Sequence, residues 1–210
     1  MKKYILLLIV SVLFLLLSAY SYVNAVSNNL ADSVFRLHVI ANSDSKEDQE
    51  LKYKVRDSLI EYMNTLTNDM NSKEEVIEIA KVHLKDFKEI AQNVVKENGY
   101  NYDVNVEIGN FSFPTKTYGD ISFPAGFYDA LKVEIGKAEG QNWWCVMFPP
   151  LCFVDVTSGV VPEESKENLQ ENLGDEEYEL ISDTENDSIL NVKFKIIELF
   201  ESIGTKLANN

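Results

Sequence analysis

The sequence predicts an α+β fold, in which a mostly antiparallel sheet carries two long helices packed on one face. Three observations predict it: an early strand pattern, two successive amphipathic helix patterns, and then several strands with alternating polarity. An apolar fraction of 45% is typical of a chain that buries one sizeable core. We expect a folded domain over residues 30–158, an acidic flexible linker over 159–188 and a C-terminal amphipathic helix over 189–210.

The first half of the predicted domain is one strand followed by both helices. The strand is expected over 34–40, where large apolar residues alternate with Arg36 and His38. The first helix begins near Ser45, after a run of residues that favour helix caps. The second helix is expected over 72–98, because its apolar residues recur every three to four positions. These two helices are expected to cover one face of the sheet.

The later strands are predicted where apolar and polar residues alternate, and the linker is predicted where that pattern ends. Apolar and polar residues alternate over 103–108 and 131–135, and 143–156 is expected to form two apolar strands around a Pro-Pro turn. From 162 to 188 there are eleven acidic residues and one basic residue, Lys166. Such a segment buries too little apolar area to offset its ordering entropy, which predicts a mobile connector.

Charge and rare residues exclude several function classes. The 34 acidic residues outnumber the 19 basic ones and give a formal net charge of −15. A chain this acidic repels phosphate backbones, so nucleic-acid binding is not expected. Two cysteines and two histidines are too few for a zinc ribbon or a multi-bridge scaffold. We therefore expect no metal site and no cofactor.

The N-terminal segment has the layout of an export signal. Lys2 and Lys3 precede an apolar run over 5–17, and small residues near Ala25 fit cleavage after that residue. The alternative is an uncleaved membrane anchor over 4–23, which is long enough to cross a hydrocarbon core. Both alternatives place the rest of the chain outside the cytoplasm.

Cys145 and Cys152 flank a turn that contains Pro149 and Pro150. In an exported protein such a pair can oxidise to a disulfide. The alternative is two buried free thiols. A catalytic thiol is not expected, because burial raises the pKa of a thiol and makes it inert.

Two further sets of residues allow both a functional and a structural interpretation. His38 could act as a general base beside a carboxylate such as Asp44, but we favour a polar strand face with a salt bridge from Arg36 to Asp57 or Glu61. His83 is expected to be a satisfied core or boundary residue. The aromatic residues between 111 and 128, held among prolines and glycines, suit either a contact patch or ordinary core packing.

Long sequence blocks add a family resemblance. They are RLHVIANSDS at 36–45, FPTK at 113–116, FPAG at 123–126, NWWCV at 142–146 and FPPLCF at 148–153. Together they resemble the stage II sporulation protein R family of endospore-forming Firmicutes. The loop over 136–140 departs from the resembled pattern at Ala138, where the family often has glycine.

The resemblance implies a non-enzymatic signalling protein, secreted from the forespore into the space between the forespore and mother-cell membranes. There it would activate a mother-cell membrane aspartic protease of the stage II sporulation protein GA type, which processes the precursor of sigma factor E. Its own membrane association would be transient, or anchored through residues 4–23. Two other functions stay open: an exported cell-wall hydrolase that uses His38 or His83, and a structural wall-associated module.

An activator of this kind needs a contact surface. The residues expected to bind the partner are Arg36, His38, Asn42, Asp44, Phe113, Tyr118, Phe123, Tyr128, Trp143 and Trp144.

Overall fold

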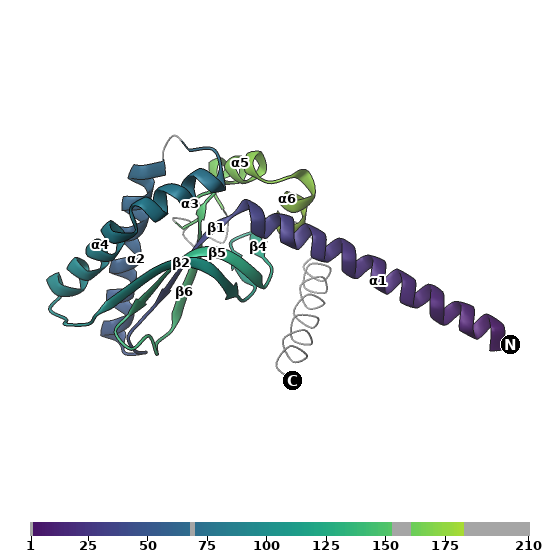
Figure 1. Cartoon of the computed structure of the whole chain (residues 1–210), viewed down its shortest axis with the longest axis horizontal. Coiled ribbons are helices and arrows are strands. Elements are labelled where there is room, and N and C mark those ends of the chain that lie inside the picture. Colours follow the sequence, from purple (N-terminus) through teal and green to yellow (C-terminus); the bar gives the residue numbers. More distant parts are fainter. Residues whose placement is uncertain (1, 68–69, 153–160, 183–210) are drawn as a thin grey trace.

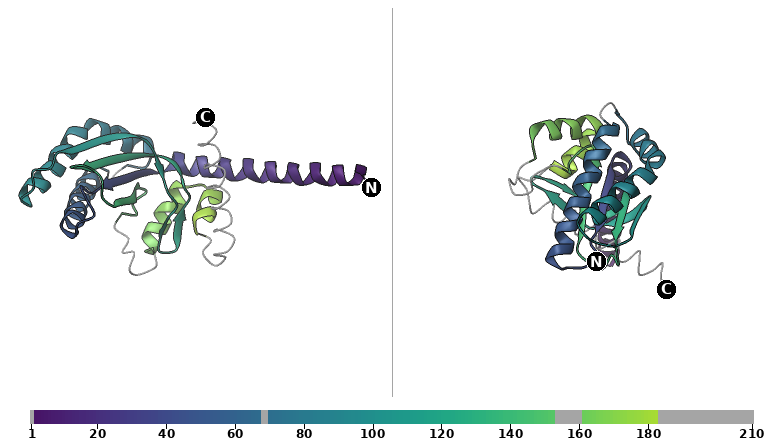
Figure 2. Two further views of the ribbon diagram at one scale, coloured as in Figure 1. Left: turned by 90° about the horizontal axis from the view of Figure 1, so that it is seen from below. Right: turned by 90° about the vertical axis from the view of Figure 1, so that its left-hand side faces the viewer.

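The structure is a computed structural model that describes residues 2–67, 70–152 and 161–182. A mixed domain of helices and strands carries a long helix, α1 (Lys2–Ser33), which projects from it as a rod (Figures 1 and 2). The remaining elements in chain order are β1 (Phe35–Ile40), α2 (Lys46–Thr67), α3 (Lys73–Val82), α4 (Leu84–Glu97), β2 (Val104–Phe113), β3 (Lys116–Tyr118), β4 (Ile121–Phe123), β5 (Gly126–Ile135), β6 (Asn142–Phe148), α5 (Glu163–Asn172) and α6 (Asp175–Ser182).

Four strands form the main sheet, in the order β2-β5-β1-β6. The β2–β5 and β1–β6 pairs are antiparallel and the β1–β5 pair is parallel, so the prediction of an α+β fold with a mostly antiparallel sheet is confirmed. Strands β3 and β4 form a separate antiparallel hairpin. The first strand of the domain is thus an inner strand, with Leu37 between Leu131 and Cys145 of its neighbours.

Helices α2, α3 and α4 pack on one face of the sheet (Figure 1). Leu51, Val55, Leu59 and Met63 of α2 are buried there, as their spacing predicts. The expected single helix over 72–98 is instead two helices, which break at His83. His83 leaves helical geometry (φ −96°, ψ 14°), and its backbone N–H still donates to the Ile79 carbonyl.

The opposite face of β1 differs from the expectation of a polar surface. Arg36 is fully buried and His38 is 8% exposed, although both alternate with apolar residues along the strand. As an inner strand, β1 has neighbours on both edges. The aromatic side chains of Phe113, Tyr118 and Tyr128 cover its second face around Arg36. The alternating residues of β1 correctly indicated that the strand has two different faces. The face that carries Arg36 and His38 is nevertheless buried like the other one.

The mobile connector expected over 159–188 needs correction for the described part, 161–182. This part forms α5 and α6 and buries Leu169, Leu173 and Ile181. The few apolar residues are spaced to face the domain, while most of the acidic side chains point to solvent. Polar contacts tie the segment down: Val161 donates its N–H to Asp120, and Lys166 pairs with the same carboxylate at 2.6 Å.

The other predicted segments outside the domain are described in part or not at all. The expected C-terminal helix over 189–210 lies outside the described residues. Ala25 is exposed within α1, whereas Val26 and Leu30, just beyond it, are buried against the domain. Counted over the described residues alone, no helix has the length and apolar character needed to cross a membrane.

The backbone conformation of the loop between β5 and β6 explains why this loop favours glycine. Gly136 and Ala138 both have left-handed backbone angles, with φ of +60° and +53°. A β-carbon added to Gly136 would overlap the side chain of Asn42. Ala138 adopts the same strained region with a β-carbon present, which costs about 1 kcal/mol. The loop conformation therefore favours glycine at both positions.

We predict that Gly136→Ala lowers the free energy of unfolding by about 2 kcal/mol, because it adds both left-handed strain and a clash with Asn42. Urea unfolding followed by circular dichroism measures this change. Ala138→Gly is the matched control: it removes the strain and should leave stability equal or slightly higher. Equal losses in the two variants would contradict the explanation.

Candidate functional site

A buried cation lies on the face of the sheet opposite α2, α3 and α4. The Arg36 guanidinium carbon lies 4.2 Å from the ring centroid of Phe113, 4.7 Å from that of Tyr128 and 5.5 Å from that of Phe123. Its Nη2 donates a 2.9 Å hydrogen bond to the Tyr118 hydroxyl. Within the described residues Arg36 has no carboxylate partner, so aromatic faces and one hydroxyl stabilise its charge.

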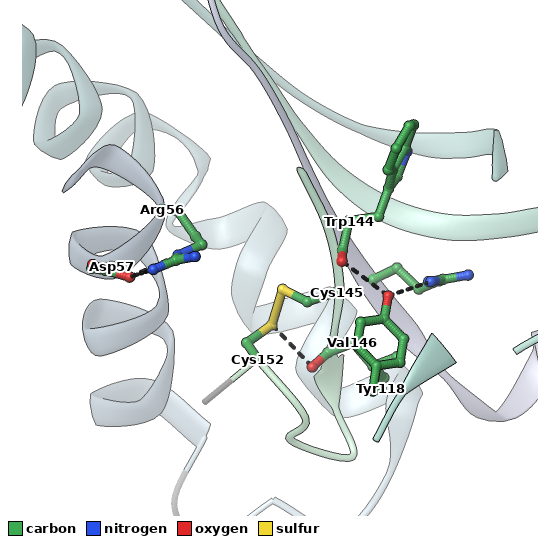
Figure 3. Close-up of a disulfide and its surroundings, with 8 residues drawn as sticks. Arg56, Asp57, Tyr118, Trp144, Cys145, Val146 and Cys152 are labelled. Atoms are coloured by element: carbon green, nitrogen blue, oxygen red, sulfur yellow. Dashed lines mark hydrogen bonds and ion pairs between the residues drawn. A yellow bond between two sulfur atoms is a disulfide. The ribbon is translucent and has the colours of Figure 1, made fainter. Parts of the chain in front are cut away.

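This geometry contradicts the predicted salt bridge from Arg36 to Asp57 or Glu61. Asp57 pairs instead with its neighbour Arg56 at 2.6 Å, on the helix side of the sheet (Figure 3). The physical reason is the pleat of the sheet. Successive side chains of a strand alternate between faces, and Arg36 lies on the face that Phe113 and Tyr128 cover.

Four of the predicted partner-binding aromatics are core residues. Phe113, Tyr118, Phe123 and Tyr128 are at most 5% exposed, so of the two alternatives for these four residues core packing is confirmed and an exposed contact patch is not. They bury the Arg36 side chain, which requires large rings on that face. In contrast, Phe127, which lies among the same candidate aromatic residues between 111 and 128, is 57% exposed.

Tyr118 links the hairpin to the main sheet. Its hydroxyl accepts from Arg36 and donates to the Trp144 carbonyl at 2.9 Å (Figure 3). Burial raises the pKa of Tyr118, while the positive charge of Arg36 opposes that shift. The phenol therefore stays protonated at neutral pH and can donate to the carbonyl.

His38 lies beside this cluster on the same strand face. Its Nε2 is 2.6 Å from the Asn142 amide oxygen, and its ring stacks on Trp144 at 5.4 Å between centroids. Burial lowers the pKa of His38, so the ring is neutral at pH 7. A neutral ring donates Nε2–H to the amide oxygen and leaves Nδ1 as an acceptor without a partner among the described residues.

Asn42 and Asp44, also predicted to bind the partner, join two loops of the domain. The Asn42 amide donates to Asp48 at 2.8 Å and accepts the backbone N–H of Lys137 at 3.0 Å. Asp44 accepts the backbone N–H of Gln141 at 2.7 Å. These bonds place both side chains in the framework that holds the β5–β6 loop.

Asp48 closes this framework at the start of α2. It is 4% exposed and accepts hydrogen bonds from Ser43 and Asn42. Burial opposes ionisation of the carboxyl, but hydrogen bonds from Ser43 and Asn42 outweigh it and hold the pKa of Asp48 below its usual value. The framework therefore depends on a charged carboxylate.

Trp143 and Trp144 point to opposite faces of β6, because successive side chains of a strand alternate. Trp143 lies on the helix side, edge-on to Tyr53 at 5.6 Å between centroids. The Arg56 guanidinium carbon lies 4.3 Å from the Trp143 ring and 5.0 Å from the Tyr53 ring. We call Tyr53, Arg56 and Trp143 the aromatic–arginine cluster.

The aromatic–arginine cluster reaches the surface, since Tyr53 is 39% exposed and Trp143 is half-buried. The sequence pattern indicated Trp143 as a contact residue, but not Tyr53 or Arg56. A signal was present, because residues three apart on a helix share one side, and a tyrosine there interrupts the polar face of α2. That Tyr53 and Arg56 contact Trp143 of β6 is visible only in the tertiary structure.

The two cysteines form a disulfide, as one of the two alternatives predicted (Figure 3). Their Cα atoms are 5.2 Å apart. Leu151 also donates its N–H to the Val146 carbonyl at 3.0 Å, so the proline-containing turn folds back along β6. The disulfide closes this turn, because it links β6 to the segment that follows the two prolines.

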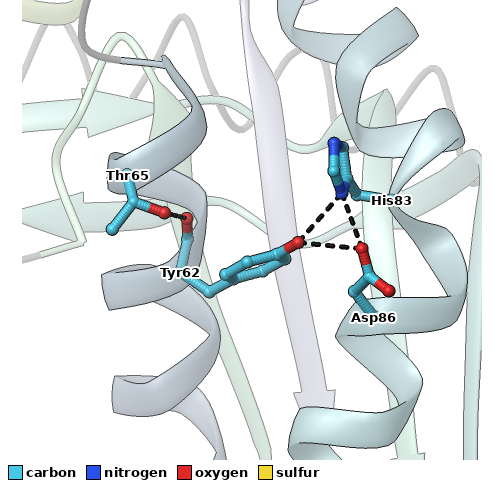
Figure 4. Close-up of polar contacts among 4 residues, drawn as sticks. All are labelled: Tyr62, Thr65, His83 and Asp86. Carbon is cyan, nitrogen blue, oxygen red and sulfur yellow. Dashed lines mark hydrogen bonds and ion pairs between the residues drawn. The ribbon is translucent and has the colours of Figure 1, made fainter.

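His83 occupies the boundary position that was predicted for it (Figure 4). Its Nδ1 lies 2.6 Å from the Asp86 carboxylate and 2.9 Å from the Tyr62 hydroxyl, which donates to the same carboxylate. Hydrogen bonds from His83 and Tyr62 lower the pKa of Asp86. The three residues join α2 to the break between α3 and α4. No group of three or more potential metal-binding side chains occurs in the described segments.

Comparison with known proteins identifies a family for the central part of the chain. The sequence profile of the family described as stage II sporulation protein R matches residues 31–158, which include β1 to β6 and the residues discussed above. The chain belongs to the stage II sporulation protein R family. Membership in the stage II sporulation protein R family supports a role in sporulation.

A curated member of the family is stage II sporulation protein R of Bacillus subtilis (strain 168). It is 39% identical over 138 residues, which are 66% of this chain and 62% of that protein. The match thus spans about three-fifths of the length of the relative. No solved structure matches the chain.

We predict that Tyr118→Phe lowers the free energy of unfolding by about 2 kcal/mol, because it leaves Arg36 and the Trp144 carbonyl without their shared buried partner. Chemical denaturation measures the loss. Tyr53→Phe removes a hydroxyl that makes no hydrogen bond within the described residues, so it should change stability by less than about 0.5 kcal/mol. A comparable loss in both variants would count against the Arg36–Tyr118–Trp144 chain.

We also predict a pH-dependent contribution from Asp48. Because its pKa is lowered on folding, its stabilising effect is complete above the unfolded pKa of about 3.9 and is lost as pH falls through the lower folded value. At pH 7, Asp48→Asn should cost about 2 kcal/mol. Urea unfolding at several pH values should show the gap between wild type and variant narrowing below pH about 4. A constant gap would rule out this contribution.

Proposed function

We propose that this protein is an exported sporulation signal that activates a mother-cell membrane aspartic protease of the stage II sporulation protein GA type. The protease processes the precursor of sigma factor E. The observation that carries the proposal is family membership over 31–158, the part of the chain that contains the whole sheet. In this proposal the protein leaves the forespore and acts in the intermembrane space, after cleavage at Ala25 or anchored by residues 4–23.

The proposed action is contact without bond chemistry. An activator shifts a receptor toward its active state only by binding that state more tightly, by about 1.4 kcal/mol for each tenfold shift in population. The two histidines support a non-catalytic role. His38 is neutral and hydrogen-bonded to an amide, and His83 joins helices through Tyr62 and Asp86.

The aromatic–arginine cluster is the proposed contact surface. Tyrosine, tryptophan and arginine are the residues most enriched at binding hot spots. Here the two rings meet edge-on and the Arg56 guanidinium lies over both, so little side-chain entropy is lost on binding. Trp144, on the other face of β6, contributes a second partly exposed ring beside Lys116. This surface replaces the buried aromatics as the proposed site.

Co-expression with the protease and the sigma-factor precursor tests the proposal, with precursor cleavage as the readout. Arg56→Ala and the double variant Tyr53→Ala/Trp143→Ala should lower cleavage by about tenfold or more, because each removes hot-spot contacts. Their melting temperatures and export should be measured in parallel, so that loss of fold is separated from loss of contact.

Val82→Ala is the matched control, since Val82 is a 68% exposed apolar residue on α3 that lies outside the cluster. It should leave cleavage unchanged. If the wild-type protein fails to promote cleavage, the proposed function is wrong. If folded cluster variants promote cleavage normally, only the choice of surface is wrong.

A further inference from the structure

The main sheet has two edge strands, whose outer sides we call its margins. The two margins differ in the hydrogen-bond partners of their backbone N–H and C=O groups. Strand β6 forms one margin and β2 forms the other. A margin with free N–H and C=O groups is a template for an additional strand. The backbone partners of each margin therefore decide where an extended chain can be added.

The β6 margin is closed in its second half. The Trp144 carbonyl accepts from the Tyr118 hydroxyl, and the Val146 carbonyl accepts from the Leu151 N–H. The disulfide holds the turn that supplies Leu151 in place. An added strand would have to displace both partners.

The β2 margin is open. The Asp103 carbonyl accepts the N–H of Gly136, the residue after β5. The Val104 N–H points the other way, away from β5, and donates to the side chain of Gln92. Because these directions alternate along an antiparallel strand, Val106, Ile108, Asn110 and Ser112 point their backbone groups outward. Within the described residues, nothing forms a hydrogen bond with these outward groups.

The β2 strand also lacks features that usually protect a margin. Its ten residues keep one unbroken register with β5, without a bulge. It contains no proline and no lysine, which are common protective residues on edge strands. Gly109, Asn110 and Ser112 are small and allow another backbone to approach.

We propose that the β2 margin binds an extended segment of the partner protein as a fifth strand, which deepens and rests on the proposed activation by contact. In this binding mode main-chain hydrogen bonds supply affinity, and alternate side chains supply specificity. The margin lies at the other side of the sheet from the aromatic–arginine cluster, so the two surfaces can contact the partner separately.

Charge indicates what kind of segment fits. Glu107 is the one charged residue of β2, and its side chain is 47% exposed. Lys132 pairs with Glu107 at 3.3 Å and with Glu134 at 2.6 Å, so one cation is shared between two carboxylates. This group of three has an excess negative charge, which favours a lysine or arginine on the added strand opposite Glu107.

Phe111 lies on the same face as Glu107, four residues further along, and is half-buried. The matching segment therefore has a basic residue and an apolar residue four positions apart. A second copy of this chain does not fit this pattern. Strand β2 has no basic residue, so no register places a cation opposite Glu107, and each copy carries a net charge of −15.

Proline substitutions test the margin without breaking the sheet. The N–H groups of Asn110 and Ser112 point outward and make no ladder bond with β5, so proline at either position is compatible with an edge strand. Asn110→Ala and Ser112→Ala keep the N–H. In the co-expression assay, cleavage should be about tenfold lower for each proline variant than for its alanine counterpart.

Two further measurements keep the test decisive if a proline variant folds poorly. Glu107→Lys reverses the proposed specificity charge at an exposed position and should also lower cleavage. In wild-type protein, hydrogen exchange at Val106, Ile108, Asn110 and Ser112 should slow when membranes that contain the protease are added, relative to membranes without it.

The outcomes separate this proposal from the proposed function. Normal cleavage by folded proline variants, or unchanged exchange along β2, overturns strand addition and leaves activation intact. Failure of the wild-type protein overturns activation, and strand addition to that protease with it. A wild-type dimer in sedimentation that the proline variants dissociate would show that the margin binds a second copy, which also overturns the proposal.

Discussion

The buried charge of Arg36 is the constraint on which the half of the domain opposite α2, α3 and α4 depends. A guanidinium on an inner strand, fully removed from solvent, needs compensation, since an unpartnered buried charge costs several kcal/mol. Here three aromatic rings and the Tyr118 hydroxyl provide it. This requirement explains why aromatic residues from β2, the β3–β4 hairpin and β5 converge on one point.

The same constraint determines which surfaces are free. Tyr118 must reach Arg36, and from there its hydroxyl also satisfies the Trp144 carbonyl and closes part of the β6 margin. The rings that cover Arg36 are buried, so the two proposed contact surfaces, the aromatic–arginine cluster and the β2 margin, lie elsewhere on the domain. One buried cation thus links core packing to the placement of the interaction surfaces.

Local patterns predicted much of the fold correctly. The two-faced alternation of β1, the start of the second helix at residue 72 and the apolar spacing of α2 all agree with the structure, because each depends on neighbours in sequence. The prediction over 161–182 was wrong because composition counts apolar residues but not their spacing. Leu169, Leu173 and Ile181 suffice to dock two short helices on surfaces supplied by other elements.

The sequence by itself determined the fold class, the strong acidic charge, the family and the residue types at the centre of the domain. Only the tertiary structure decided which of those residues are exposed. Phe113 and Phe127 have similar side chains, yet one covers Arg36 and the other faces solvent. The physical reason is that burial depends on strands distant in sequence. β1 pairs with β5 and β6, about a hundred residues away, and no local pattern specifies which side chains that pairing will cover.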